Sequence, residues 1–109
     1  MVIISFDTEE LKQRCCEYAV AEQAYGAANA RALFAAISDA EANETVQDWM
    51  DLAGDAITIE KHCSLILSFG SELHASLIPV GTRFEKADDG SVKWQTVQRL
   101  KLVHIGGAN

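Results

Sequence analysis

The apolar positions of this chain repeat at helical spacing in its first half and at every second residue in much of its second half. Residues 2–6, "VIISF", form an apolar run rich in β-branched side chains, which predicts a first strand. Asp7 and Glu10 then resemble a capping box, and they predict a helix that ends near Gly26. The residues on its expected buried face are Leu11, Cys15 and Tyr18.

A second helix is expected at residues 27–42, because apolar side chains recur there with the period of a helix. Residues 45–52 predict a shorter helical turn, with Trp49 as a core residue rather than a platform for a ligand. The apolar stripe of the second helix consists of Ala30, Leu33, Phe34, Ile37 and Ala40.

The alternation of apolar and polar residues predicts strands at residues 57–62, 64–69, 73–80 and 98–105. Pro79 suggests that the third of these is an edge strand or carries a bulge. One helical turn is expected around Trp94 and Val97. The order predicts an α+β fold, with an N-terminal strand, two helices and then three to four mostly antiparallel strands.

The size and composition of the chain favour one soluble domain over residues 1–109. It has 109 residues, of which 49% are hydrophobic, and it has no apolar run of about 18 residues that would predict a membrane span. No basic residue precedes "VIISF", so no secretory signal is expected. Cys15, Cys16 and Cys63 are an odd number and a poor disulfide framework, which favours the reducing cytoplasm.

The net charge of −7 is divided unevenly between the two parts of the chain. Residues 1–60 hold twelve acidic and three basic residues, whereas residues 61–109 hold six basic and four acidic ones. All three histidines, His62, His74 and His104, also lie in the second part. Only that part is expected to face nucleic acid or an acidic protein, although a solvated acidic surface beside an ordinary sheet explains the same pattern.

Sequence motifs for metal, phosphate-loop or hydrolase chemistry are missing. There is no glycine-rich phosphate loop, no Gly-x-Ser-x-Gly and no Cys-x-x-Cys pair. His62 and Cys63 are adjacent, so on a strand they point to opposite faces and cannot easily chelate one ion. Cys15 and Cys16 have no nearby histidine in sequence that would activate a thiolate. We expect neither a metal nor a cofactor.

The closing strand offers a better candidate for function. Regular alternation would place Arg99, Lys101 and Val103 on one face, and His104 with Leu100 and Leu102 on the other. Two cations on one face would lie about 7 Å apart, which suits phosphates along an RNA backbone or the carboxylates of a partner. His104 could act as an acid or base. The alternative to a functional site is that Arg99 and Lys101 lie on the solvent-exposed side of an edge strand, where cations discourage aggregation.

Several stretches of the chain resemble the RelE/ParE superfamily of toxins from toxin–antitoxin systems. They are the initial "VIISF", the Tyr25-Gly26 step before an Ala/Leu-striped helix, and "DDGSVKWQTVQRLKLVHI" with Gly90, Trp94 and Val97. The nearest branch is that of the HigB-like plasmid-maintenance killer proteins, and the resemblance covers nearly the whole chain. It implies a small α+β toxin, held by a cognate antitoxin, that cuts messenger RNA on the ribosome without a metal ion.

The resemblance also implies roles for individual residues. His74 stands where the family usually has an arginine, and Lys61 is the cation nearest to the missing Leu-Lys-Gly-Asp-Arg-like stretch. These two, with His104 as a weaker candidate, are the expected catalytic residues. The residues expected to position RNA or a partner are Arg83, Arg99 and Lys101.

A second reading of the same resemblance is a catalytically inactive protein-interaction module that keeps the fold. The acidic net charge opposes long-range attraction to RNA. "GGAN" stands where the family often ends in Asp-Tyr-His, so that aromatic and imidazole pair is absent. A homodimer also remains open.

Overall fold

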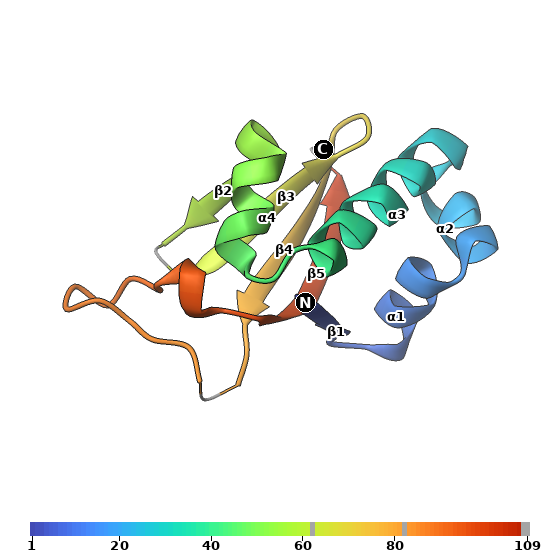
Figure 1. Cartoon of the computed structure of the whole chain (residues 1–109). Helices are drawn as coiled ribbons and strands as arrows, with labels where there is room; N and C mark the ends of the chain where they lie inside the picture. Colours follow the sequence, from blue (N-terminus) through green and yellow to red (C-terminus); the bar gives the residue numbers. More distant parts are fainter. Residues whose placement is uncertain (62, 82, 108–109) are drawn as a thin grey trace.

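The computed structural model describes residues 1–61, 63–81 and 83–107, which form four α-helices and a five-stranded sheet (Figure 1). This confirms the predicted α+β class. In chain order the elements are β1 (Ile3–Phe6), α1 (Glu9–Cys16), α2 (Tyr18–Tyr25), α3 (Ala27–Ala42), α4 (Val46–Ala53), the 3-10 turn η1 (Gly54–Ala56), β2 (Ile57–Glu60), β3 (Ser64–Phe69), β4 (Leu73–Pro79), the 3-10 turn η2 (Trp94–Thr96) and β5 (Arg99–Gly107).

The sheet has the strand order β1-β5-β4-β3-β2 and is mostly antiparallel, as predicted. The exception is β1, which pairs in parallel with β5, so that Ile4 lies beside Leu100 and Phe6 beside Leu102. The closing strand is therefore an interior strand, with β1 on one side and β4 on the other. The alternative of an edge strand with a wet side was wrong, because the first strand of the chain returns to cover that edge.

The first helical segment is two helices rather than one. Glu17 adopts an extended conformation with φ −116° and ψ 107°, which ends α1 and starts α2. The cap of α1 is Thr8, whose Oγ1 accepts a hydrogen bond from the Leu11 amide at 3.2 Å, and not Asp7 as predicted. The break lets α2 pack against α3 and leaves Tyr18 exposed, with its ring edge-on to Phe34 at 5.6 Å between centroids.

The second predicted helix, α3, matches its prediction at both ends, and the third, α4, has the predicted length but begins and ends one residue later. The side chains of Leu33 and Ile37 on α3 are buried, as the stripe required. α4 has eight residues and is capped by Thr45, whose Oγ1 accepts from the Asp48 amide at 3.2 Å. Trp49 is only 1% exposed, which confirms it as a core residue.

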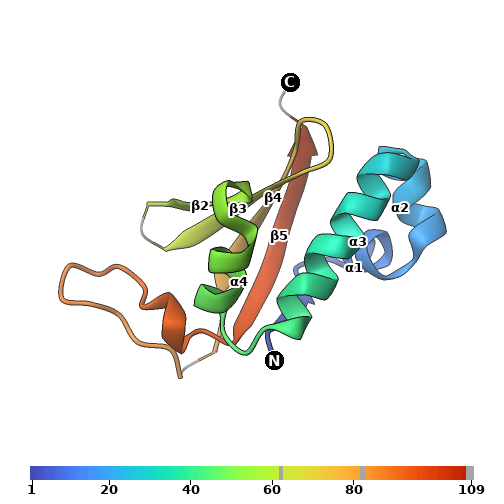
Figure 2. The same cartoon turned by 45° about the horizontal axis from the view of Figure 1, so that its top comes forward.

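All four helices lie on one side of the sheet (Figures 1 and 2). α1, α2 and α3 gather toward β1, and α4 stands toward β2. We call the side of the sheet beneath them the covered face. It supplies most of the apolar core, where burial of each large aliphatic side chain stabilises the fold by about 1.5–3 kcal/mol. The buried strand residues on this face are Ile57, Leu65, Leu67, Phe69, Ala75, Leu77, Leu100 and Leu102.

The other side of the sheet, here called the open face, carries the alternate strand residues. Its composition is mainly polar or basic, with a few aliphatic side chains. The open-face residues used below are Ile3, Ser5, Ser68, His74, Ser76, Ile78, Arg99, Lys101 and His104.

A β-bulge in β5 changes the predicted alternation. Leu77 pairs with Leu102 and Ser76 pairs with His104, so Val103 is the extra residue. His104 therefore shares the open face with Arg99 and Lys101, and its predicted place beside Leu100 and Leu102 was wrong. Pro79 is the last residue of β4, an interior strand, so the predicted edge was wrong, whereas the alternative of a bulge agrees with the register shift between Ser76 and Leu77.

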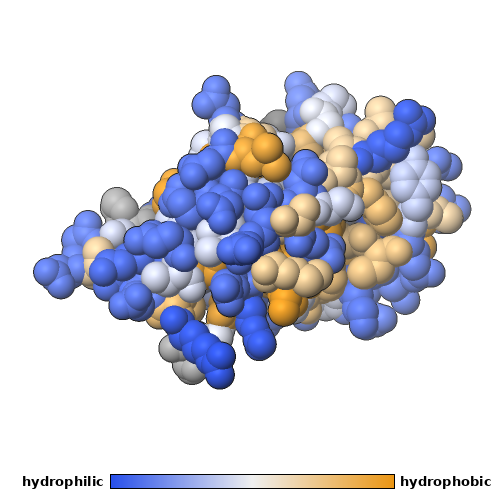
Figure 3. Space-filling view, viewed as in Figure 1, coloured by the Kyte–Doolittle hydropathy of each residue, from blue (hydrophilic) through white to orange (hydrophobic). Residues whose placement is uncertain are grey.

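The connection from β4 to η2 projects away from the helices (Figures 1 and 2). Hydrogen bonds brace it, from the Glu85 amide to Thr96 Oγ1 at 2.9 Å and from the Lys93 amide to the Glu85 carbonyl at 2.9 Å. On the side seen in Figure 3 its surface is mostly polar, whereas apolar surface gathers over α2 and α3. Within the described ranges, no helix combines the length and the hydropathy that a membrane span needs.

Candidate functional site

The open face carries an imidazole on each of two neighbouring interior strands, β4 and β5. His74 lies on β4, where its Nδ1 is 3.2 Å from Ser68 Oγ on β3. This hydrogen bond orients the ring from one side and leaves Nε2 for a ligand. Across the sheet on the other side, His74 pairs with Gly106 of β5.

The second imidazole, that of His104, lies close to Gly106, the residue that pairs with His74. A methyl group built on Gly106 would come within 2.7 Å of His104 Nε2, so the absence of a side chain at Gly106 makes room for the ring. His74 and His104 are diagonal neighbours on adjacent strands, a relation that spaces residues by roughly 7–8 Å. The bulge at Val103 puts His104 on the same face as His74, and the missing side chain at Gly106 leaves room for the His104 ring.

Lys101 adds a cation to the same face. It pairs with Ile78 on β4 and with Ser5 on β1. Its Nζ lies 3.4 Å from Asp7 Oδ1 at the end of β1, and both side chains are substantially exposed. Because the ammonium group has other donors free and water around it, this contact leaves Lys101 able to meet an anion.

Lys61 does not join His74. It follows Glu60, the last residue of β2, with φ +52°, and Glu60 pairs with Ser64 at the start of β3, whereas His74 pairs with Ser68 near the other end of that strand. The four residues from Ser64 to Ser68 separate the two positions by about 13 Å along β3. His62, considered above with Cys63 as a metal ligand, lies outside the described residues.

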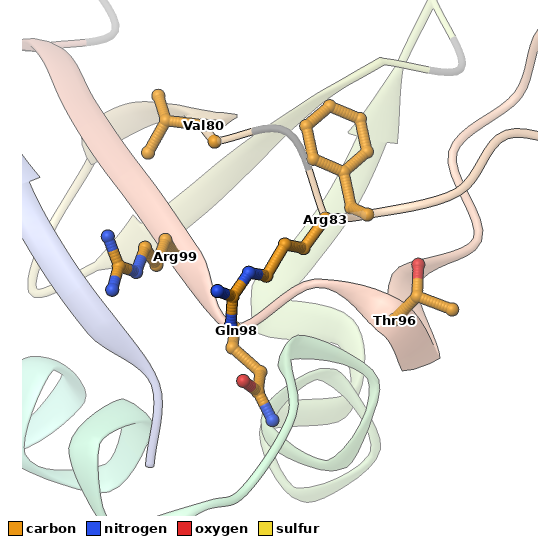
Figure 4. Close-up of a pocket in the computed structure, with 7 residues that line it drawn as sticks. Val80, Arg83, Thr96, Gln98 and Arg99 are labelled. Carbon is orange, nitrogen blue, oxygen red and sulfur yellow. The ribbon is translucent and has the colours of Figure 1, made fainter.

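Arg83 and Arg99 line one cavity of about 310 Å³ at the start of β5 (Figure 4). Arg99 belongs to the first position of β5, and Arg83 comes from the connection after β4. In Figure 4 the Arg83 side chain reaches from that connection toward β5, where Arg99 and Gln98 stand. The structure thus brings together two residues that are sixteen positions apart, and Lys101 follows two residues later on the same strand face.

The cysteines offer no activated nucleophile. Burial raises the pKa of the Cys15 thiol to about 12, with a smaller contribution from the neighbouring Cys16. A thiol with a raised pKa holds its proton, so Cys15 is a poor nucleophile at neutral pH. Cys16 and Cys63 are exposed, and all three are free. Among residues 1–61, 63–81 and 83–107, histidine, cysteine and acidic side chains form no cluster that could hold a metal ion.

Ser68, Gly106 and Gln98 were not singled out by the sequence. Ser68 and Gly106 matter only because of their partners across the sheet, and Gln98 matters only because the β4–β5 connection folds over it. Period-two alternation would have placed Ser68 on a polar face, but no local signal ties it to His74.

Searches of protein-family models, curated proteins and solved structures found no match to this chain. The resemblance to the RelE/ParE toxins therefore stays a prediction from the sequence, and the fold class and the open-face geometry carry the functional argument.

Proposed function

We propose that this protein is a metal-independent endoribonuclease of the toxin kind, with its active site on the open face of the sheet. The observation that carries the proposal is the placement of His74 and His104 on one solvent-accessible face, on adjacent strands, on either side of Gly106. Two imidazoles and a cation are enough for cleavage of RNA through its own 2′-hydroxyl, which needs a base, an acid and charge stabilisation.

The roles follow from the chemistry of that cleavage. One imidazole accepts the 2′-hydroxyl proton as the oxygen attacks the adjacent phosphorus, and the other donates a proton to the departing 5′-oxygen. The products are a 2′,3′-cyclic phosphate and a 5′-hydroxyl, so the proton count balances. The hydrogen bond between Ser68 Oγ and His74 Nδ1 orients the imidazole, so that Nε2 is the nitrogen that exchanges a proton with the RNA. Lys101 lies two pairing positions along β4 from His104 and four from His74, so it offsets negative charge on the phosphate oxygens from the His104 side.

The biological setting that suits this chemistry is a type II toxin–antitoxin system. The resemblance supports an antitoxin as partner and messenger RNA as target, and the acidic helices are compatible with a basic partner segment. A homodimer is a further arrangement to examine by measuring the molar mass in solution.

The test is cleavage of a single-stranded RNA by the purified chain in excess EDTA, with a DNA of the same sequence beside it. We expect RNA fragments with cyclic phosphate ends and intact DNA, because DNA lacks the 2′-hydroxyl. His74→Ala and His104→Ala should each lower the rate by roughly 10²–10⁴-fold, the usual contribution of an acid or base. Lys101→Gln should lower it by about 10²–10³-fold.

Lys93→Gln is the matched control, because it removes one exposed lysine charge from the connection rather than from the open face. It should leave the rate unchanged. A folded protein that leaves RNA intact, or one whose cleavage survives both histidine substitutions, would defeat the proposal.

A catalytically inactive interaction module is the second candidate. Leu52 on α4 is 64% exposed and Ile59 on the edge strand β2 is 48% exposed, so apolar surface is available for a protein partner away from the open face. Growth of a bacterial host during induced expression separates the two. Arrest that His74→Ala relieves supports the nuclease, and normal growth with a soluble, folded product supports the module.

A further inference from the structure

The cavity that Arg83 and Arg99 share has an unusual charge for its molecule. The chain carries a net charge of −7, yet none of the described residues lining this cavity is acidic. Within the described part of the chain, neither guanidinium lies within ion-pair distance of a carboxylate. Two cations that line one cavity with no acidic neighbour in its lining favour a bound anion.

The walls of the cavity are fixed by contacts on both sides of Arg83. Upstream, the Val80 amide donates to the Arg99 carbonyl at 3.1 Å. Downstream, the Glu85 amide donates to Thr96 Oγ1 at 2.9 Å, and that hydroxyl donates to the Lys93 carbonyl at 2.6 Å. Val80 and Thr96, two of the residues that line the cavity, are therefore held in place by hydrogen bonds to Arg99 and Glu85.

The remaining lining residues point to the chemical class of the ligand. Arginine is suited to phosphate because its planar donors can make two parallel hydrogen bonds. Phe84 supplies an aromatic ring, half-buried against the core cluster, and Gln98 supplies an amide that can both donate and accept. A volume of about 310 Å³ lies at the small end of the roughly 300–1,000 Å³ range of ligand pockets.

We infer that this cavity is a binding site for a nucleoside monophosphate group, with the phosphate between Arg83 and Arg99 and the base against Phe84. The group has two sources, a free mononucleotide or the phosphorylated end of an RNA strand. Only the RNA end requires the proposed nuclease function. Arg99 and His104 share the open face and are five residues apart on β5, which places them roughly 15 Å from each other. An RNA whose phosphorylated end is bound in the cavity would then be cleaved at a fixed distance from that end, at the phosphate that lies beside His74 and His104.

Binding is measured by calorimetry at low salt, with the intact chain and five probes. They are adenosine 5′-monophosphate, adenosine, inorganic phosphate, and a short RNA with a 5′-phosphate or a 5′-hydroxyl. We expect the monophosphate to bind at least about tenfold more tightly than adenosine or phosphate alone, because both the guanidinium and ring contacts are needed. Inorganic phosphate that binds as tightly as the mononucleotide would overturn the base contact.

Variants locate the site. Arg83→Gln and Arg99→Gln should each weaken mononucleotide binding by about tenfold or more, the effect of losing one charge-assisted hydrogen bond. Lys86→Gln, which removes a cation from the same connection but does not line the cavity, should leave the affinity unchanged. Equal losses in all three variants would mean diffuse charge attraction, and the site would be rejected.

The RNA arms identify the source. Tighter binding of the 5′-phosphorylated RNA than of both the mononucleotide and the 5′-hydroxyl RNA supports an RNA end. Binding of the mononucleotide alone supports a free nucleotide. His104→Gln should keep mononucleotide binding while strongly lowering the cleavage rate, so failure of the nuclease proposal and failure of this one give different results. No measurable affinity for any phosphorylated probe would overturn the inference.

Discussion

The covered and open faces of the sheet are made by alternate residues of the same five strands, yet they differ in almost every physical respect. The covered face is apolar, and the described residues include no buried polar or charged one. The open face carries two histidines, Lys101 and Arg99 in contact with water. Stability is concentrated on one face, so the other is free to hold charged groups whose burial would be costly.

The largest expected effect is on stability and comes from the covered face. Leu33 on α3 is fully buried in the core between the helices and the covered face, and Leu33→Ala should lower the free energy of unfolding by about 2–5 kcal/mol. Ile3→Ala is the matched change on the open face, where Ile3 is 49% exposed, and should cost less than about 1 kcal/mol. Urea unfolding followed by circular dichroism measures both. Similar losses from the two variants would remove the distinction between the faces.

The next effect is a pH dependence that comes from Cys15 on the covered side. Because burial raises the pKa of its thiol from 9.0 to about 12, the unfolded chain loses this proton first as pH rises. The native state then binds more protons than the unfolded state, so the free energy of unfolding falls between about pH 9 and 12, by up to about 1.4 kcal/mol per pH unit from this group.

Cys15→Ala should make that decline shallower when the unfolding midpoint in urea is compared at pH 8.5 and 10. Cys16→Ala is the control, because Cys16 is the exposed neighbour on the same helix. If the two variants show the same slope as the unsubstituted chain, the thiol of Cys15 is not protected in the folded state.

The smallest effect belongs to the ion pair of the open face. Lys101 and Asp7 approach to 3.4 Å with both side chains partly exposed, so Lys101→Gln should change the free energy of unfolding by no more than about 1 kcal/mol. The same variant is expected to reduce RNA cleavage strongly. A thermal melt at low and high salt checks the stability, and a loss of several degrees would assign Lys101 to structure instead of function.

Local patterns predicted much of the fold. Helical periodicity predicted both ends of α3 and most of its buried residues, although Phe34 of the same stripe is only partly buried. Trp49 was predicted as a core residue and is buried. The break at Glu17 was missed, since no proline or glycine marks it and only packing of α2 on α3 explains it. The parallel pairing of β1 with β5 was missed because it joins residues at opposite ends of the chain.

The candidate site was predictable in its residue types but not in its arrangement. His74, His104 and Lys101 were identified individually, and regular alternation then put His104 on the wrong face. One extra residue, Val103, reverses the alternation after Leu102, and such an insertion has no signature in a run of β-branched and apolar residues. The cavity of Arg83 and Arg99 depends on how the β4–β5 connection folds back, which no local rule describes.

The position of β5 also bears on synthesis of the chain. Ser5 on β1 donates a hydrogen bond to the Leu100 carbonyl, a contact that spans 95 residues. Until residues 99–107 leave the ribosome, β4 has an unpaired side and β1 has no neighbour in the sheet, and exposed strand edges of this kind recruit other chains. Closure of the sheet is thus a late event, and we expect nascent chains that pause before residue 99 to depend on chaperones.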